Sequence, residues 1–404
     1  LSQSRGGRCT LLGSDEKTLP GLAALANGAL SHVLDFEDSH EKALVHPNAV
    51  SIPTLMALAQ ETGNISGKEF LTAMVVASDV CCRLDLAIKE DLLKYGWNMP
   101  PIHGGMGAVM GAANMLRLDA GQIQDAIAIQ MTSMSSSGQA ALSRDSVIRA
   151  VRDGFAAQSA VGAVLLAREG LPARFDRALE GELGYFHAYA RGHYEPEAVL
   201  EGLGERFESA NISFKPWPCC RATHAALEIV RNLARQNEIK PEDVENIHIV
   251  MQEIGRMVFE PVEVKYRPKL AEIAKLSMPF VIATMLEYGT VELESFSAQR
   301  LSDPKIAGLA QKVTYEIDKT LTKASNKQTI VTIKMNDGRS YTAENRFPLG
   351  CVENPLSDED MYSKFFDCMS AGIKKFSAEK IKRIFNIIMN IEKEQNINDL
   401  FVML

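Results

Sequence analysis

The sequence predicts a mainly α protein with a large all-α helical domain and a smaller α+β domain. Two observations lead to this expectation. Apolar residues recur at helical spacing from about residue 21 to 205, whereas β-branched and alternating runs begin only after Asn211. We therefore expect an all-α domain at residues 1–207, an α+β domain at 208–350 and C-terminal helices at 351–404 that pack back on the first domain.

The first domain should contain seven helices, because its apolar runs are rich in Ala, Leu and Met and are joined by short links with Gly, Pro or Asn. The expected helices span residues 21–34, 49–61, 67–89, 104–116, 120–134, 147–169 and 176–190. Gly105 to Gly111 has the spacing of a nucleotide-binding glycine loop, but no strand precedes it. We interpret these glycines as positions where helices pack closely.

The second domain should combine strands with helices. Alternating or β-branched runs predict its strands, and Asn336-Asp337-Gly338 between the last two is a typical hairpin turn. The expected strands span 247–251, 328–335 and 339–343, and the expected helices span 222–236 and 276–288. Two amphipathic helices, 358–369 and 378–391, should follow in the C-terminal part.

Composition argues against several classes of protein. The net charge is −8 and the basic residues are scattered, so a nucleic-acid-binding face is not expected. No run of 18 apolar residues predicts a membrane span, and the N-terminus lacks a signal-peptide pattern. The seven cysteines include no Cys-x-x-Cys pair, which argues against disulfides, zinc and iron–sulfur clusters. We expect a reduced, cytoplasmic protein whose natural start precedes Leu1.

The stretch 32–47 concentrates chemical groups. Asp35 and Ser39 fall near the end of a predicted helix, and two histidines, the second being His46, follow in the link to the next helix. A polar link between two apolar helices is a suitable place for chemistry. The alternative is that Asp38 or Ser39 caps the next helix while both histidines are solvated.

Two further stretches offer functional groups. Asn98 and His103 lie beside Trp97 and two prolines, in either a structured substrate loop or a rigid connector. Arg149 and Arg152 share one face of a helix, where two guanidinium groups can bind carboxylates. The alternative for the arginines is a solvated helix start.

The stretch 214–224 contains two prolines followed by Cys219, Cys220 and Arg221 just before a helix. A rigid turn that carries Lys215 and Arg221 at a helix N-terminus would bind an anion or lower the pKa of a thiol. The alternative is a proline-stabilised turn with buried, unreactive cysteines.

Together these stretches resemble the MmgE/PrpD family. The motifs occur in the family's order, span nearly the whole chain and are specific as a set, and only the family's opening helices are expected to be missing. The motifs are Asn27-Gly-Ala-Leu-Ser-His-Val-Leu-Asp-Phe-Glu-Asp-Ser-His40 with His46-Pro47, Gly96-Trp97-Asn98, Lys215-Pro-Trp-Pro-Cys-Cys-Arg-Ala-Thr-His224, Ser277-Met-Pro-Phe280 and Glu353-Asn-Pro-Leu-Ser-Asp358.

The resemblance implies a large helical domain, a smaller α+β lid, an active site between them, a homodimer, and no obligatory metal or other cofactor. Members of the family dehydrate 2-methylcitrate, decarboxylate cis-aconitate or epimerise iminodisuccinate. These reactions all make or break a bond beside a carboxylate. The expected substrate is therefore a small polycarboxylate.

Four residues match positions that the family uses in its active site: Asp35, Ser39, His46 and Lys215. Four others depart from the family's pattern: Asn98 and Cys220 stand where the decarboxylases have His, Arg149 where they have Lys, and Phe280 where many members have Tyr. The departures make a cis-aconitate decarboxylase unexpected, although Cys at position 220 does occur in other members.

For the mechanism, we expect His46 to act as base or acid, with Asp35 orienting its ring. Lys215, Arg149 and Arg221 would hold the substrate's carboxylates, Ser39 and Asn98 would orient a hydroxyl or carboxylate, and His224 is a further binding residue. His103 and Cys220 are the candidates for a second proton-transfer group.

Three hypotheses follow. The first is a hydro-lyase that dehydrates a 2-methylcitrate-like hydroxy acid or hydrates the product. The second is an epimerase, in which His46 and Cys220 would transfer protons on opposite faces of the substrate. The third is a polycarboxylate-binding protein that kept the site and lost turnover, for which Asn98 and Phe280 are the motivating features.

Overall fold

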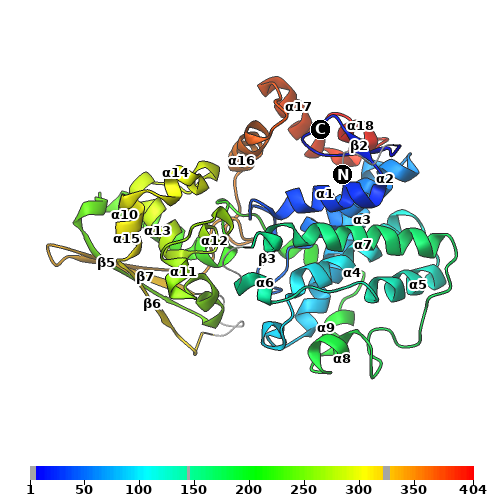
Figure 1. Cartoon of the computed structure of the whole chain (residues 1–404), viewed down its shortest axis with the longest axis horizontal. Coiled ribbons are helices and arrows are strands. Elements are labelled where there is room, and N and C mark those ends of the chain that lie inside the picture. Colours follow the sequence, from blue (N-terminus) through cyan, green and yellow to red (C-terminus); the bar gives the residue numbers. More distant parts are fainter. Residues whose placement is uncertain (1–5, 143–145, 322–327) are drawn as a thin grey trace.

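The computed structural model describes residues 6–142, 146–321 and 328–404 of the chain. Two bodies lie side by side, one built mainly of helices and one containing a sheet, and the C-terminal helices lie along their boundary (Figure 1). We call them the helical domain and the sheet domain. The chain is therefore mainly α and has two domains, as the sequence predicts.

The helical domain contains most of the long helices. Its helices are α1 Pro20–His32, α2 Pro47–Thr62, α3 Gly67–Ala87, α4 Met99–Met115, α5 Ala120–Met131, α6 Gln139–Leu142, α7 Ile148–Arg168, α8 Tyr185–Ala190 and α9 Pro196–Leu200. Two antiparallel strand pairs accompany them: β1 Cys9–Thr10 with β2 Lys17–Thr18, and β3 Ser39–His40 with β4 Ile212–Ser213. The β3–β4 pair connects the link after α1 to the start of the sheet domain.

Glycines bring the central helices close together. A Cβ atom at Gly107 or Gly111 of α4 would lie only 2.3 or 2.4 Å from a carbonyl oxygen of α3. Gly28 of α1 and Gly154 of α7 meet in the same way, since a Cβ at Gly28 would lie 2.7 Å from the Cα of Gly154. The interpretation of the glycines of α4 as packing positions is confirmed, and the close approach of α1 to α7 positions the site described below.

The start of α4 differs from the sequence prediction. The helix expected at 104–116 begins at Met99, with Asn98 as its N-terminal cap residue. Pro100 and Pro101 resemble loop residues, but the first turn of a helix tolerates proline because its N–H groups have no helical partner. The expected loop is therefore the first turn of a helix.

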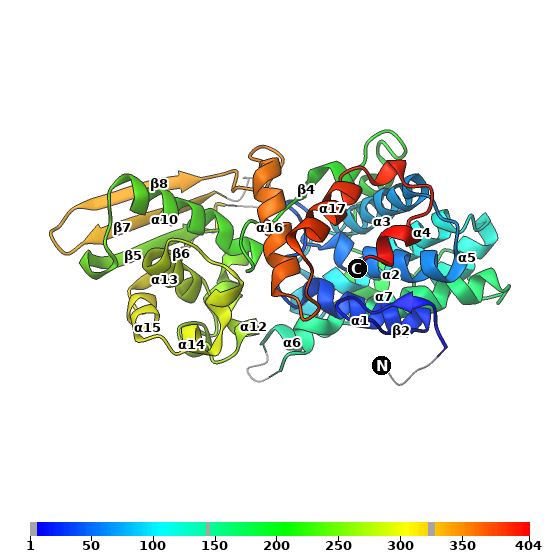
Figure 2. The same ribbon diagram turned by 90° about the horizontal axis from the view of Figure 1, so that it is seen from above.

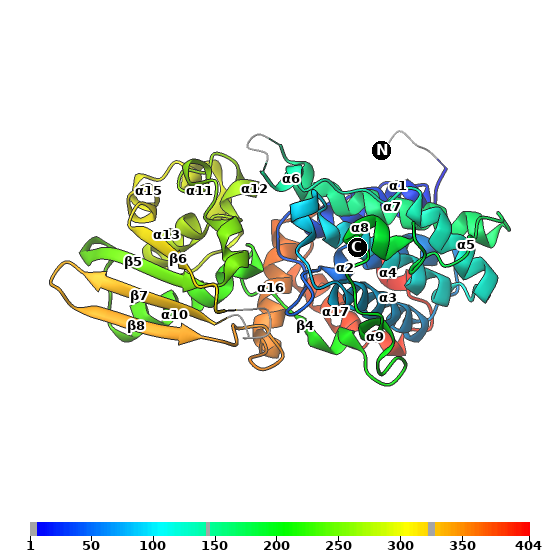
Figure 3. The ribbon, with the colours of Figure 1, turned by 90° about the horizontal axis from the view of Figure 1, so that it is seen from below.

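The sheet domain is built around four strands in the order β6-β5-β7-β8, with β5 and β6 parallel and the other pairs antiparallel. The strands are β5 Val244–Met251, β6 Val313–Ile317, β7 Thr329–Met335 and β8 Ser340–Asn345. The helices are α10 His224–Gln236, α11 Val262–Lys265, α12 Ala271–Ala274, α13 Met278–Tyr288, α14 Ala298–Leu301 and α15 Pro304–Ala310. Helices α10 and α13 cover one face of the sheet (Figure 3). Alternate residues of β5 and β7 are buried against them.

Two other predictions need correction. The helix expected at 176–190 is limited to α8, because Gly181 and Gly184 disfavour helix in the preceding turns. Strand β6 was not predicted, since its five residues alternate in burial only weakly and follow a short helix directly. The remaining expected helices and strands, including α17 (Ala378–Ile388), agree with the structure to within about three residues at each end.

The C-terminal part consists of α16 Asp358–Ala371, α17 Ala378–Ile388 and α18 Asn398–Phe401. Helix α16 runs across the boundary between the two domains (Figure 2). The last helix packs on the helical domain, where the ring of Phe401 meets that of Phe70 edge-on with 5.5 Å between centroids. In the described part of the chain, the helices are too short or too polar to cross a membrane.

Candidate active site

The turn that follows α1 is held by lysines from other parts of the chain. Asp35 has a positive φ of 50°, a left-handed backbone conformation that is uncommon for a residue other than glycine and that ends the helical path of the chain. Three lysines donate hydrogen bonds to three carbonyl oxygens of the turn: Lys275 to Val33 at 2.8 Å, Lys215 to Asp35 at 3.1 Å and Lys364 to Phe36 at 2.8 Å. Residues 33–37 are thus fixed by the sheet domain and by α16 together.

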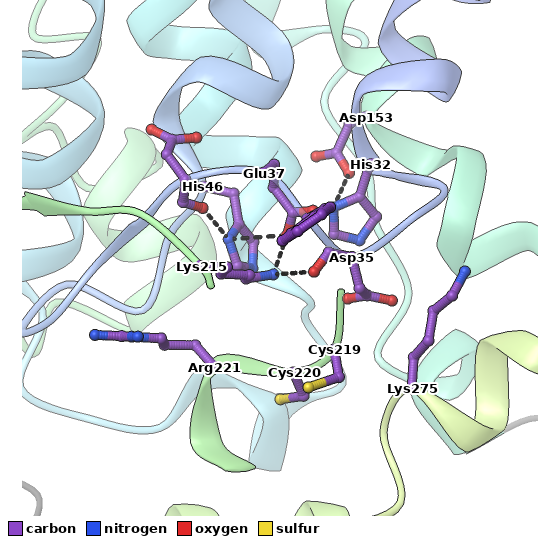
Figure 4. A network of polar contacts seen from close by, with 12 residues as sticks. His32, Asp35, Glu37, His46, Asp153, Lys215, Cys219, Cys220, Arg221 and Lys275 are labelled. Atoms are coloured by element: carbon purple, nitrogen blue, oxygen red, sulfur yellow. Dashed lines mark hydrogen bonds and ion pairs between the residues drawn. The ribbon is translucent and has the colours of Figure 1, made fainter. Parts of the chain in front are cut away.

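Glu37 is the centre of the polar network at this turn. Its Oε1 lies 2.6 Å from Nζ of Lys215, 3.3 Å from Nδ1 of His46 and 3.4 Å from Nδ1 of His32 (Figure 4). All four side chains are buried or nearly so. The structure therefore brings His46 and Lys215 together, and it adds Glu37 and His32, which the sequence analysis did not select.

The protonation states follow from burial and charge. Burial opposes ionisation of Glu37, but Lys215 and the two histidines hold the pKa of its carboxyl well below the ordinary value. Burial likewise opposes the charge on Lys215, and the charges of Glu37 and Asp35 outweigh it and raise the pKa of Lys215. Burial lowers the pKa of His46 to about 4 despite Glu37. At neutral pH the network contains a carboxylate, an ammonium and a neutral imidazole.

The orientation of the His46 ring also fixes its tautomer. Nδ1 of His46 lies 2.8 Å from the carbonyl oxygen of Asp38. Because a carbonyl oxygen only accepts hydrogen bonds, Nδ1 carries the proton and Nε2 keeps its lone pair. The expected role of Asp35 in orienting this ring is therefore wrong: the backbone of Asp38 and the side chain of Glu37 hold it instead.

Asp35 pairs with Arg149. The two guanidinium nitrogens NH1 and NH2 of Arg149, near the start of α7, donate to the two carboxylate oxygens of Asp35, each at 3.0 Å. Burial opposes ionisation of Asp35, yet Arg149, His32 and Lys215 hold the pKa of its carboxyl below the ordinary value. The side chain of Arg149 is only 11% exposed, although Val147 and Ile148 beside it at the start of α7 are exposed. Its guanidinium group already holds a carboxylate of the protein, and its expected role in holding the substrate stays a prediction.

The capping alternative for the stretch 32–47 is correct in part. Both carboxylate oxygens of Asp38 lie 3.3 Å from the backbone nitrogen of Asn48, in the first turn of α2, and one accepts from its side-chain amide at 2.8 Å. The histidines, however, are not solvated: the side chain of His46 is only 15% exposed, and His40 is buried 3.3 Å from Glu208. Asp38 therefore stabilises the helix start that positions His46.

A second group of missed residues lies behind the turn. Nδ1 of His32 lies 3.5 Å from a carboxylate oxygen of Asp153, whose other neighbour is Arg152, with 3.6 Å between Nε and Oδ2. Arg152 and Arg149 do share a face of α7, as predicted. Both are nearly buried, so this face belongs to the site and not to the solvent.

The stretch 214–224 folds as a rigid turn, but its groups bind the protein itself. Arg221 donates to Glu41 at 2.7 Å and to the carbonyl oxygens of Leu349 and Pro348 at 2.8 and 3.2 Å. His224 is fully buried, and burial and the charge of Arg221 hold its pKa well below the ordinary value. These contacts fix Arg221 and His224 in the scaffold of the site, and their expected role in substrate binding stays a prediction.

The two cysteines of this stretch differ. Cys219 is buried and burial raises the pKa of its thiol to about 12, so this cysteine agrees with the alternative of a buried, unreactive thiol. Cys220 is only partly buried, and its backbone N–H donates to the carbonyl oxygen of Lys275 at 2.9 Å. Figure 4 shows both sulfur atoms on the sheet-domain side of the network, below Lys215 and Asp35.

The remaining predicted site residues lie outside the network around Glu37. His103 is buried in α4, 2.6 Å from the hydroxyl of Tyr185. Ser39 is buried in the β3–β4 pair. Asn98 is partly buried, and its side-chain nitrogen has no hydrogen-bond partner among the described residues. Phe280 lies in the apolar core of the sheet domain, so the missing hydroxyl at that position is compatible with a packed core.

One group of side chains in the described residues is close enough to hold a metal ion. The possible ligand atoms of His32, Asp35 and Glu37 lie within 4.8 Å of one another. Both oxygens of Asp35 are bound by Arg149, however, and Oε1 of Glu37 is bound by Lys215. A divalent cation would meet two fixed positive charges, so we assign no metal to this site.

Models of known protein families match both domains of the chain. The model of the MmgE/PrpD N-terminal domain matches residues 2–197, and that of the MmgE/PrpD C-terminal domain matches residues 217–389.

Three similar proteins share about a quarter of their residues with this chain. The cis-aconitate decarboxylase-like protein oryM of Aspergillus oryzae is 26% identical over 98% of this chain and 85% of its own length. The cis-aconitate decarboxylase of Aspergillus terreus is 25% identical over 98% and 84%, and that of Homo sapiens 26% over 94% and 78%. The two domain matches cover most of the chain in the order of its own domains, and the chain belongs to the MmgE/PrpD family.

Proposed function

We propose that this protein is a lyase that acts on a small polycarboxylate, and more specifically a hydro-lyase that removes water from a hydroxy acid such as 2-methylcitrate, or adds it to the product. One observation carries the proposal: the imidazole of His46 and the ammonium of Lys215 lie within 3.3 Å of the same oxygen of Glu37. They come from the helical domain and from the start of the sheet domain. A base and a cation are thereby fixed beside each other.

Dehydration next to a carboxylate needs these two groups. A base removes the proton from the carbon beside the carboxylate, and the electron pair is stabilised as charge on that carboxylate until the C–O bond breaks. Nε2 of His46 has its lone pair free and would take the proton. Lys215 would stabilise the developing charge, and the departing hydroxide would take a proton from Lys215 or Cys220 and leave as water.

The substrate itself would tune the base. Burial lowers the pKa of His46 to about 4 in the free protein, below the value that suits a general base at neutral pH. A bound polycarboxylate brings two or three negative charges, which raise the pKa of a nearby imidazole. We therefore expect His46 to become a better base only when the substrate is bound.

Decarboxylation is the second candidate, because the similar proteins are named cis-aconitate decarboxylases. It uses the same stabilisation of charge beside a carboxylate, and the carbon that loses CO₂ then takes a proton. Asn98, Arg149 and Cys220 are the departures that led us to favour water loss. Four further expectations stay predictions. They are that the protein could be an epimerase, that it could be a binding protein without turnover, that it forms a homodimer and that it is cytoplasmic.

The test is a proton NMR time course in deuterated buffer with 2-methylcitrate, citrate, cis-aconitate and iminodisuccinate. Loss of water identifies a hydro-lyase, loss of CO₂ a decarboxylase, and deuterium exchange with inversion an epimerase. Broadened ligand signals without reaction identify a binding protein. The matched control for variants of His46 is His248→Gln, since His248 lies on β5 with its side chain 39% exposed.

A further inference from the structure

Lys265 is a buried lysine of the sheet domain that the mechanism above does not use. It is the last residue of α11 and only 3% of its surface is exposed. The hydroxyl of Ser277 donates to its carbonyl oxygen and also accepts from the N–H of Phe280 at 3.1 Å, which caps α13. The backbone of Lys265 is thereby fixed to the core of the sheet domain.

Hydrogen bonds place Lys265 next to the active site. Ser277, which binds its carbonyl oxygen, comes two residues after Lys275, and the carbonyl oxygen of Lys275 accepts from the N–H of Cys220 at 2.9 Å. The charges that act on its ammonium come from Cys220, Arg149 and Asp35. Cys220 and Arg149 are each partly accessible to solvent, whereas 3% of the surface of Lys265 is exposed. Lys275 extends from the sheet domain to the turn that carries Asp35, where it binds the carbonyl oxygen of Val33 (Figure 4).

The ammonium of Lys265 has no hydrogen bond or ion pair with any residue in 6–142, 146–321 or 328–404. Burying a positive charge without a partner is unfavourable. The unfavourable burial is reflected in a pKa of Lys265 lowered to about 8, which still leaves most of the amine protonated at neutral pH. Nζ of Lys265 is not among the fully enclosed unpartnered atoms of the described side chains, so a small ligand can still reach it and supply the partner.

Three other cations of the site already have carboxylates of the protein, and Lys275 and Lys364 donate to backbone carbonyl oxygens. Lys215 binds Glu37, Arg149 binds Asp35 and Arg221 binds Glu41. These are the three cations that the sequence analysis assigned to the substrate. Lys265 differs from all of these cations, because its ammonium has neither a carboxylate nor a carbonyl partner among the described residues.

We propose that Lys265 binds a carboxylate of the substrate and selects for polycarboxylates with more than two acidic groups. This inference rests on the proposed function, because it takes a small polycarboxylate as the ligand. It assigns to a residue of the sheet domain the role that Arg149 and Arg221 were expected to play. The contact would be a charge-assisted hydrogen bond from Nζ to a carboxylate oxygen.

The test measures binding of unreactive acids by calorimetry at neutral pH. Propane-1,2,3-tricarboxylate has no hydroxyl to lose, and pentanedioate is the same chain without the central carboxyl. The variants are Lys265→Met, which keeps the length of the side chain, and the control Lys269→Met, an exposed lysine four residues further on. We expect Lys265→Met to bind the tricarboxylate about 10- to 100-fold more weakly and to lose the preference over the dicarboxylate. Lys269→Met should match the wild type.

Thermal unfolding without ligand separates binding from folding. Removing an unpaired buried charge should leave the Tm of Lys265→Met unchanged or higher. Equal tricarboxylate binding by Lys265→Met and wild type overturns the role of Lys265 and leaves the proposed function standing. A lower Tm or an unfolded variant overturns it as well, since Lys265 would then have a structural partner. If the wild type binds neither acid, the proposed function fails and this inference fails with it.

Discussion

Lys215 forms a buried ion pair with Glu37, with 2.6 Å between Nζ and Oε1, although the two residues lie 178 positions apart in the chain. The pair joins the start of the sheet domain to the turn after α1. His46 contacts the same oxygen, so the position of the proposed base depends on the pair.

The ion pair should show strong coupling in a double-mutant cycle. Glu37→Gln and Lys215→Met should each cost about 3 to 5 kcal/mol, because each leaves a buried charge unpaired. The double variant should lose less unfolding free energy than the sum of the two single losses, as measured by chemical denaturation. The matched control is the surface pair Lys334 and Glu245, at 2.7 Å, whose coupling should be close to zero. Additive effects at Glu37 and Lys215 would contradict the pair.

Arg149→Lys should lower the stability of the protein although it keeps the positive charge. Arg149 binds both oxygens of Asp35, and a lysine ammonium cannot reproduce this bidentate geometry. We expect a loss of about 1 to 2 kcal/mol in unfolding free energy together with lower activity. Arg168→Lys, near the exposed end of α7, is the control and should have little effect. Full stability of Arg149→Lys would show that the second hydrogen bond is unimportant.

Stability should fall with acid because of His46. Its pKa is about 4 in the folded protein and near 6.5 when unfolded, so the unfolded state takes up a proton first. The contribution of His46 to the unfolding free energy is fully present above about pH 6.5 and is lost as the pH falls to about 4. Asp38, whose pKa burial raises to about 6, acts in the opposite direction, so the comparison must be made between variants.

The comparison uses unfolding free energies of wild type, His46→Gln and His248→Gln between pH 7 and 4. His46→Gln should lose about 2 to 3 kcal/mol less than the wild type over this range, after discounting for the slight exposure of the ring. His248→Gln should follow the wild type. Parallel curves for all three proteins would mean that His46 titrates normally.

Lys364→Met should reduce activity more than stability. Nζ of Lys364, on α16, donates to the carbonyl oxygens of Phe36 and Lys215 at 2.8 and 2.9 Å, and thereby ties the C-terminal part to the site. We expect about a tenfold lower kcat/KM with the fold retained, because the turn at 33–37 loses one of its three lysines. Lys382→Met on α17 is the exposed control, and equal activities of the two variants would exclude this role.

The sequence was sufficient to predict much of the arrangement. The long helices were visible because their apolar periodicity is strong, and His46 and Lys215 were selected from their motifs and from polar links between apolar runs. The glycines of α4 were understood as packing positions because no strand preceded them. These features could be predicted because each depends on residues that are close together in the sequence.

The partners within the site were not predictable in the same way. That Arg149 binds Asp35 depends on the close approach of α1 and α7 at Gly28 and Gly154, which is a property of the packed structure. Glu37 stood inside a selected motif, but acidic residues after a helix are usually solvated, and only the burial beside Lys215 distinguishes it. Lys265 gave no local signal, since it lies in a charged, partly exposed segment.

The central claim is that Nε2 of His46 removes the proton beside a carboxylate of the substrate. The direct measurement is the initial rate of the reaction identified by NMR, at neutral pH and a saturating concentration of the polycarboxylate substrate. It is made for wild type, His46→Gln and His248→Gln. We predict that His46→Gln loses about 100-fold or more in kcat while still binding the unreactive tricarboxylate, and that His248→Gln matches the wild type. Full activity of a folded His46→Gln variant would contradict the account.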